Sequence, residues 1–178
     1  MTKSLLFLIL VAVICLTGCS DSPSSSSSKA TFTSLDRAEL VLILSENKLS
    51  ALPTIILDKS YSIPTKTWIE KDFSESFSKF TFGLGIKDKY LTDSLDCDDI
   101  AQGAAFCAKY LHWKETKVKR GLAFGEFHYN SSSVGPHAIN IAIVSDAGKI
   151  NVVFYEPQRR VLIELSDKER DSCAFIRF

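Results

Sequence analysis

The chain lacks an excess of charge of either sign. Its 178 residues hold 21 Lys and Arg against 21 Asp and Glu, and setting Lys3 aside with the first residues leaves the charges close to balanced. The sequence therefore has neither the basic field that nucleic-acid binding needs nor an acidic field that would attract a basic partner. No internal repeat is visible either. Function has to be sought in local groups of residues.

A long apolar run is also missing. The run "LLFLILVAVICL" holds roughly a dozen residues, whereas a helix needs about 20 to span a bilayer. Lys3 before this run and "LTGC" after it are typical of an export signal. "LTGC" resembles the bacterial lipobox, which implies a lipoprotein signal peptide over 1–18 and lipidation of Cys19. Ser20 follows where Asp would signal inner-membrane retention, so the resemblance implies the outer membrane. An ordinary cleaved signal is the alternative.

Apolar residues become scarce again directly after Cys19. The stretch "SDSPSSSSSKA" has nothing to bury, so residues 19–30 are predicted to be the lipidated cysteine and a flexible Ser-rich tether. The remainder, 31–178, has the length of one domain and is rich in Phe, Ile, Leu and Val. These features predict one folded domain, lipid-anchored to the bacterial cell envelope.

Cysteine is sparse in that predicted domain. Of five cysteines, Cys15 leaves with the signal and Cys19 carries the lipid, which leaves Cys97, Cys107 and Cys173. An odd number in an oxidising compartment leaves one thiol unpaired. Cys97 and Cys107 lie in one predicted helix, about 15 Å apart and beyond the reach of a disulfide. Cys107 and Cys173 are therefore the disulfide candidate, with two buried free thiols as the alternative.

Helix and strand patterns predict an α+β fold. Apolar spacing indicates helices over 35–51, with Ser34 as N-cap, and over 65–80. A further helix begins at Cys97 and carries a stripe of small residues that another element could approach closely. Short β-branched and aromatic runs then predict successive strands at 121–129, 137–145, 150–156, 160–165 and 173–178. This order favours an antiparallel sheet with helices on one side.

The register of one hairpin follows from its turn. If residues 147–148 form a two-residue turn, His137 falls opposite Gln158 and diagonally across from Glu156. Because side chains alternate along a strand, these three residues end an isoleucine-rich face. The small-residue face of the helix from Cys97 is expected to cover that face. The hairpin therefore predicts a polar cluster at the rim of a core.

Cys97 is the candidate nucleophile. With Asp96 as N-cap, Cys97 is the first helical residue, where unpaired backbone N–H groups and the helix dipole stabilise a thiolate. A nucleophilic cysteine also needs a base and a group that orients the base, and His137 and Glu156 are the candidates. Each residue also has an ordinary structural interpretation, such as a buried thiol or a surface histidine. The shared hairpin register favours the catalytic interpretation.

The motifs "DCDDIA" and "GPHAINIAIVSDAGKINVVFYEPQ" together resemble a known family. They are similar to the papain-like cysteine-protease domain at the C-terminus of the Marasmius mushroom agglutinin, over roughly residues 90–158. The resemblance implies a papain-like cysteine peptidase core, with a central helix packed on an antiparallel sheet, and a triad of Cys97, His137 and Glu156. The agglutinin's lectin half has no counterpart here, so sugar binding is not implied.

One departure from papain concerns the oxyanion. Papain has a glutamine six residues before its cysteine, and that position is Leu91 here. Stabilisation of the oxyanion must therefore come from backbone N–H groups or from another side chain. Gln158 and Asn140 are the candidates for contacting the oxyanion or the substrate.

Three carboxylates surround the candidate nucleophile. Like-charge repulsion from Asp96, Asp98 and Asp99 would oppose a thiolate unless their charge is used elsewhere. The oxygens of Asp98 and Asp99 suit calcium, and the resemblance implies calcium-dependent activity. The alternative needs no metal, since Asp96 would cap the helix and the other two would complement its dipole.

The sequence therefore predicts a lipid-anchored cysteine hydrolase of the envelope, a peptidase acting on a peptide or protein substrate. A cell-wall amide hydrolase is a variant of this prediction, disfavoured because "DCDD" stands where those enzymes have "DCSG". The second class is a non-catalytic envelope lipoprotein that keeps the fold as a binding or structural module. No nucleic-acid partner is expected.

Overall fold

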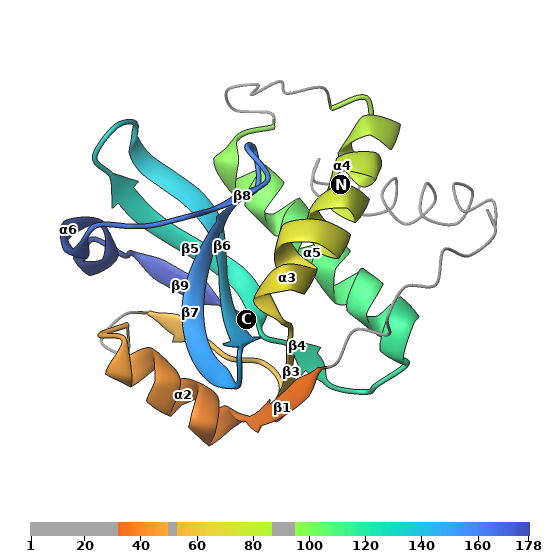
Figure 1. Ribbon diagram of the computed structural model, residues 1–178. Coiled ribbons are helices and arrows are strands. Elements are labelled where there is room, and N and C mark those ends of the chain that lie inside the picture. Colours follow the sequence, from red (N-terminus) through yellow and green to blue (C-terminus); the bar gives the residue numbers. More distant parts are fainter. Residues whose placement is uncertain (1–31, 50–52, 87–94) are drawn as a thin grey trace, which may run out of the picture.

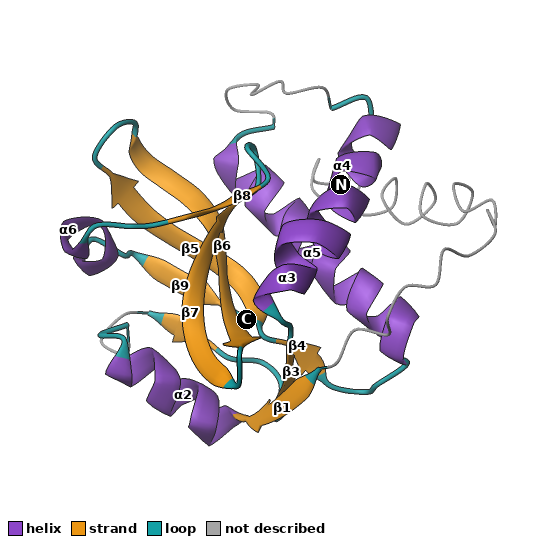
Figure 2. Cartoon of the chain, viewed as in Figure 1, coloured by secondary structure: helices purple, strands orange, loops and turns teal. Residues whose placement is uncertain are grey.

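The computed structural model describes residues 32–49, 53–86 and 95–178, so the predicted signal peptide, Cys19, the tether and Leu91 lie outside the described residues. Two sheets form in this part of the chain (Figures 1 and 2). The larger sheet has the order β2 (Thr54–Ile55), β9 (Phe175–Arg177), β5 (Phe124–Ser131), β6 (Gly135–Asp146), β7 (Lys149–Glu156), β8 (Val161–Ile163). The smaller sheet has the order β1 (Thr33–Asp36), β3 (Ser60–Ile63), β4 (Gly121–Leu122). The pairs β2–β9 and β3–β4 are parallel, and the others are antiparallel.

The helices complete the α+β class that the sequence predicts. They are α2 (Arg37–Glu46), α3 (Lys66–Trp68), the π-helix η1 (Ile69–Phe73), α4 (Ser74–Gly83), α5 (Cys97–Thr116) and α6 (Asp167–Asp171). The predicted helix over 65–80 is confirmed as the continuous helical run from α3 through α4. The helix over 35–51 is shorter than predicted, because Ser34 and Leu35 belong to β1, and Asp36 forms a capping box with Glu39.

Helices cover both faces of the large sheet, so the prediction of helices on one side is wrong. On one face Leu40 and Leu44 of α2 pack with Ile139, Ile141 and other residues of the first hydrophobic cluster. The helical run from α3 to α4 and the long helix α5 lie together on the other side, as Figure 2 shows, and their buried residues form a second cluster with that face of the sheet. The physical reason lies in β6, which is buried without interruption from residue 138 to 144 and so needs cover on both sides.

Helix α5 packs on the face opposite to the one predicted. Its small residues Ala104, Ala105 and Ala108 lie in one cluster with Ala142 and Tyr155. The stripe of small residues does permit a close approach, but the sheet residue it approaches is itself small. The bulkier isoleucines of β6 pack against the leucines of α2 instead.

The π-turn links the helical layer to the sheet. Ser74 Oγ donates to the carbonyl of Ile69 at 2.7 Å and lies 3.1 Å from the hydroxyl of Tyr155, which is fully buried on β7. Burial raises the pKa of Tyr155 to about 12, so its proton stays in place at any working pH. None of the described helices is both long enough and apolar enough to traverse a bilayer.

Candidate active site

The β6–β7 hairpin has the predicted register. Asp146 pairs with Lys149 across the turn, and Ile141 lies opposite Phe154. His137 and Glu156 consequently end the same face of the sheet, and His137 Nε2 lies 2.8 Å from Glu156 Oε2. Both side chains are mostly enclosed, at 13% and 8% exposed. The structure therefore brings these two predicted residues into direct contact.

Both oxygens of Glu156 are occupied. Oε2 contacts His137, and Oε1 accepts the backbone N–H of Gln158 at 3.0 Å. This second bond exists because β7 ends at Glu156 and the chain turns, so the predicted cross-strand pairing of His137 with Gln158 does not form. Since Nε2 of His137 is engaged, Nδ1 is the ring nitrogen left for proton transfer. The contact fixes the ring in one orientation.

Cys97 is the first residue of α5, as predicted, and its thiol lies beside β6. The backbone N–H of Ala138, the residue after His137, hydrogen-bonds to the sulfur. Burial raises the pKa of Tyr129, and the charges of Glu169, Glu156 and Cys97 add to that shift. The N-terminal end of α5 therefore meets the same end of the sheet that carries the histidine and the glutamate.

The pKa of the Cys97 thiol shifts in the direction opposite to the one predicted from the helix dipole. Burial raises the pKa of the Cys97 thiol, and the carboxylates of Asp96 and Asp98 raise it further. The N–H of Ala138 acts in the opposite direction, but the net shift is upward. Desolvation and two like charges thus outweigh the backbone N–H groups that stabilise the thiolate at this helix end.

The carboxylates beside Cys97 divide into two groups. Asp96 precedes α5 but makes no side-chain capping hydrogen bond, and its Oδ1 is buried without a partner among the described residues. Asp98 hydrogen-bonds to Asp96 and, together with burial, raises the pKa of that carboxyl. Asp99 instead lines an apolar cavity of about 250 Å³ between α4 and α5. Asp96 and Asp98 are therefore the facing pair, and Asp99, the other predicted calcium ligand, lies at the cavity.

The facing pair Asp96 and Asp98 could supply ligands to the predicted calcium ion. A buried carboxylate oxygen without a partner, next to a second carboxylate, is a hard oxygen donor set of the kind that calcium takes. No group of three or more His, Cys, Asp and Glu side chains suited to a metal occurs in the described ranges. Asp96 and Asp98 would supply two carboxylates to such an ion, and backbone carbonyls and water would have to complete its coordination.

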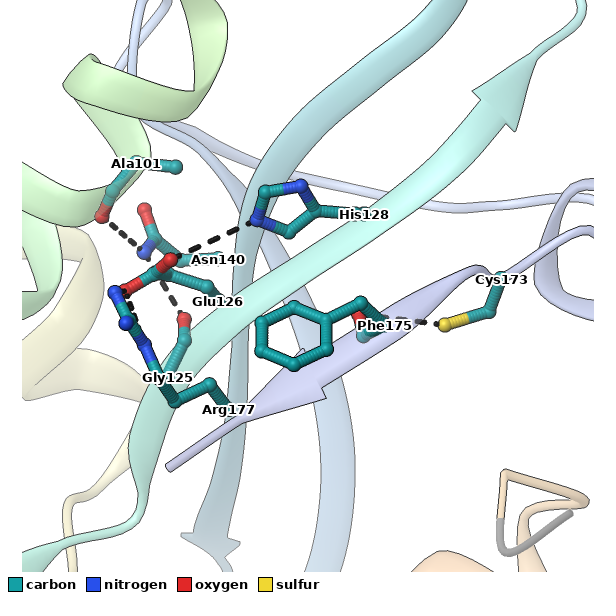
Figure 3. Close-up of polar contacts among 8 residues, drawn as sticks. All are labelled: Ala101, Gly125, Glu126, His128, Asn140, Cys173, Phe175 and Arg177. Carbon is teal, nitrogen blue, oxygen red and sulfur yellow. Dashed lines mark hydrogen bonds and ion pairs between the residues drawn. The ribbon is translucent and has the colours of Figure 1, made fainter. Parts of the chain in front are cut away.

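Asn140 holds α5 on the sheet and does not face a substrate. Its side-chain amide is fully buried and donates to the carbonyls of Ala101 at 2.8 Å and Gly125 at 3.0 Å (Figure 3). The prediction of a substrate or oxyanion contact is therefore wrong for this residue, because alternation along β6 turns it toward α5. Gln158 remains a candidate, since its Nε2 is buried and has no partner among the described residues.

The cysteines do not form the candidate disulfide. Cys97, Cys107 and Cys173 form no disulfide with one another in the structure. Cys107 belongs to the cluster on the α5 face of the sheet and Cys173 to the cluster on the α2 face, so the sheet separates them. Burial raises the pKa of Cys173 to about 11, and its Sγ contacts the carbonyl of Phe175 at 3.6 Å (Figure 3). The structure therefore shows the alternative, in which Cys107 and Cys173 are both buried and no bridge joins them.

Tyr129 is a site residue that the sequence reasoning missed. It pairs with His137 across β5 and β6, and their ring centroids are 5.8 Å apart. The sequence feature that predicts this pairing is the short loop "SSV" between Ser131 and Gly135. Gly135 has a positive φ of 80°, and the loop joins β5 and β6 as a hairpin. Registering that hairpin as well would have placed the ring of Tyr129 beside the imidazole.

Comparison with known proteins adds to this geometry. No family model and no curated protein matches the chain. The Polyporus squamosus lectin, bound to the human-type influenza-binding epitope Neu5Aca2-6Galb1-4GlcNAc, matches with a TM-score of 0.59 and 24% identity, over 82% of this chain and 49% of that one. A PSL1a–E64 complex matches with a TM-score of 0.58 and 22% identity, over 82% and 51%.

The chain has an agglutinin-like fold. It spans about half the length of the two lectins, and the likeness at this identity concerns the fold alone. The resemblance to an agglutinin that the motifs around Cys97 and His137 suggest is thereby confirmed at the level of the fold.

Proposed function

We propose that the protein is a lipid-anchored cysteine hydrolase of the bacterial envelope, a papain-like peptidase with Cys97 as nucleophile, His137 as base and Glu156 as the group that orients the base. The observation that supports it most is the 2.8 Å contact between His137 Nε2 and Glu156 Oε2, next to the backbone N–H that reaches the Cys97 thiol. This arrangement leaves Nδ1 of His137 for the proton of the thiol.

The chemistry follows from these roles. Cys97 Sγ attacks the carbonyl carbon of the scissile amide while its proton passes to Nδ1 of His137. His137 then returns that proton to the leaving amine, and a thioester remains on Cys97. His137 next takes a proton from water, the hydroxyl displaces the sulfur, and the proton returns to the thiolate. Glu156 stabilises the imidazolium, and the buried amide of Gln158 is the side-chain donor proposed for the oxyanion.

Calcium belongs to this proposal because of the raised pKa of Cys97. Asp96 and Asp98 would hold the ion, and its positive charge would offset theirs. With their charge used in this way, these two carboxylates no longer oppose ionisation of the thiol. The two aspartates would thus make activity dependent on a divalent cation.

The decisive experiment follows alkylation of Cys97 by iodoacetamide across pH, with calcium and with chelator. Cys107 and Cys173 are buried, so the label reports Cys97. We expect the midpoint to lie above the ordinary thiol value of about 8.5 in chelator and to fall below it with calcium. The double variant Asp96→Asn, Asp98→Asn should lose the calcium response. E64, which PSL1a holds in its complex, serves as a second probe of the same thiol.

A second candidate function is a non-catalytic binding or structural module of the envelope. The observation that favours it is the raised pKa of the Cys97 thiol, which is typical of an unreactive cysteine. The same titration separates the two functions. If the midpoint of Cys97 alkylation stays above pH 8.5 in millimolar calcium and E64 forms no adduct, the results would favour the non-catalytic module.

A further inference from the structure

The outer face of α5 carries a stripe of aromatic side chains. Phe106, Tyr110 and Trp113 follow one another at helical spacings of four and three residues. Their ring centroids are 6.5 Å and 6.1 Å apart, and Phe106 and Trp113 are 40% and 50% exposed. We call these three residues the aromatic stripe. Large aromatic rings gathered on one exposed helix face are unusual for a surface that only meets water.

The aromatic stripe points away from the sheet. At about 100° per residue, it lies on the side of α5 opposite to Ala101, Ala104 and Ala108, which are fully buried. Toward α4 the stripe continues into the apolar cavity of about 250 Å³, which Phe106 lines together with Phe80 and Leu84. A continuous apolar surface therefore extends from the cavity to the C-terminal end of α5.

Basic residues gather at that C-terminal end. Lys114, Lys117, Lys119 and Arg120 are all exposed, and Lys117 Nζ lies 4.1 Å from the centroid of the Trp113 ring. The acid among them, Glu115, accepts a hydrogen bond from Trp68 Nε1 at 3.1 Å. Tryptophan and tyrosine beside lysine and arginine are the side chains that proteins place at the interface of a membrane with anionic headgroups.

The N-terminal end of the described chain reaches the molecule at the same place. The ring of Phe32 packs 4.8 Å from His112 of α5 and 5.5 Å from Trp68. Thirteen peptide units separate Phe32 from Cys19, which corresponds to about 45 Å fully extended and about 20 Å on average for a flexible chain. A lipid on Cys19 would therefore keep this end of α5 close to the bilayer surface.

We propose that the aromatic stripe and its basic end dock on the interface of an anionic phospholipid bilayer. This surface takes no part in the proposed hydrolysis, and only its nearness to the bilayer rests on the lipid anchor. Cys97 lies sixteen residues before Trp113, about 24 Å along the axis and turned about 160° around it. Docking through the stripe therefore turns the candidate active site away from the membrane.

The test uses the full chain in vesicles of phosphatidylethanolamine and phosphatidylglycerol. Trp113 is half exposed while Trp68 is 1% exposed, so the emission of the Trp113→Phe variant can be subtracted to isolate Trp113. We expect phospholipids brominated in their acyl chains to remove most of the Trp113 emission, and acrylamide to quench it several-fold less than in detergent. Labelled palmitate, incorporated by the wild type and not by Cys19→Ser, checks the anchor separately.

Charge variants sharpen the test. Lys117→Glu with Lys119→Glu should restore most of the Trp113 emission in brominated vesicles, as should high salt, whereas Lys149→Glu in the β6–β7 turn should not. A Trp113 that is protected from acrylamide but not quenched by brominated lipid would overturn the proposal in favour of a second protein surface. A chain that does not float with the vesicles would also overturn it. Alkylation of Cys97 stays unchanged in these variants, so the outcome is independent of the peptidase.

Discussion

Among single residues, His137 is the one on which the proposed chemistry depends. The sequence places it at an open rim, but the structure encloses it between Glu156 and Tyr129. We expect His137→Ala to abolish turnover and also to lower the free energy of unfolding by about 1–3 kcal/mol, because the buried Glu156 loses a partner. Peptide hydrolysis and urea unfolding measure the two effects. His128→Ala on β5 is the control and should keep its turnover; equal losses in both variants would contradict the assignment.

Glu156 tests the orienting role separately. Its two oxygens accept from His137 and from the N–H of Gln158, and an amide has only one oxygen. Glu156→Gln therefore loses one of the two bonds and the negative charge that stabilises the imidazolium. We expect kcat to fall well below that of the wild type but to stay measurable, unlike that of His137→Ala. An unchanged kcat would mean that the imidazole is oriented by something else.

Among the elements, α5 depends on one buried amide for its position. Asn140 donates to the carbonyl of Ala101 in the helix and to that of Gly125 in the neighbouring strand. We expect Asn140→Ala to lower the free energy of unfolding by about 1–3 kcal/mol, since two buried hydrogen bonds between elements are lost. Urea denaturation measures this. Asn151→Ala, at an exposed position of β7, is the matched control and should be near neutral.

Some strand and helix contacts could be predicted from the sequence, and others could not. The β6–β7 register could be predicted because a two-residue turn fixes every later pairing, and that register brought His137 to Glu156. The small sheet could not be predicted, because β3 pairs with β1 and with β4, and long stretches of chain separate these strands. The face of the sheet that α5 covers could not be predicted either. Strand β6 is buried on both sides, and the alternation of its side chains does not tell which face packs against which helix.

At the scale of the whole molecule, the burial of β6 on both faces determines where several of the predicted site residues lie. It places Asn140 against α5 instead of a substrate, and it separates Cys107 from Cys173 by the thickness of the sheet. A cysteine count gives the number of thiols but not the face on which each thiol lies. The candidate active site was more predictable because its residues come from one hairpin and one helix start, which are local features of the chain.

The contacts of the C-terminal strand should make the stability of the whole molecule depend on pH. Strand β9 lies between β2 and β5, close against Gly125, where a Cβ would overlap the carbonyl of Arg177. Arg177 Nε donates to Glu126 at 3.1 Å, as Figure 3 shows. Burial alone would raise the pKa of Glu126, but the neighbouring His128, whose Nε2 lies 3.6 Å from Oε2, and the hydrogen-bonded Arg177 outweigh it, and the net shift is downward.

A pKa that is lower in the folded than in the unfolded chain means that Glu126 stabilises the fold above the unfolded value of about 4.3 and loses this effect as the pH falls through the folded value. We expect Glu126→Gln to lower the free energy of unfolding by about 1–3 kcal/mol at neutral pH. The gap to the wild type should close in acid, because the wild-type carboxyl is then protonated as well. Urea denaturation over this pH range measures the gap, with the exposed Glu164→Gln as control. A gap that stays constant below the unfolded pKa would show that Glu126 contributes through packing, with its charge having no part in holding β9.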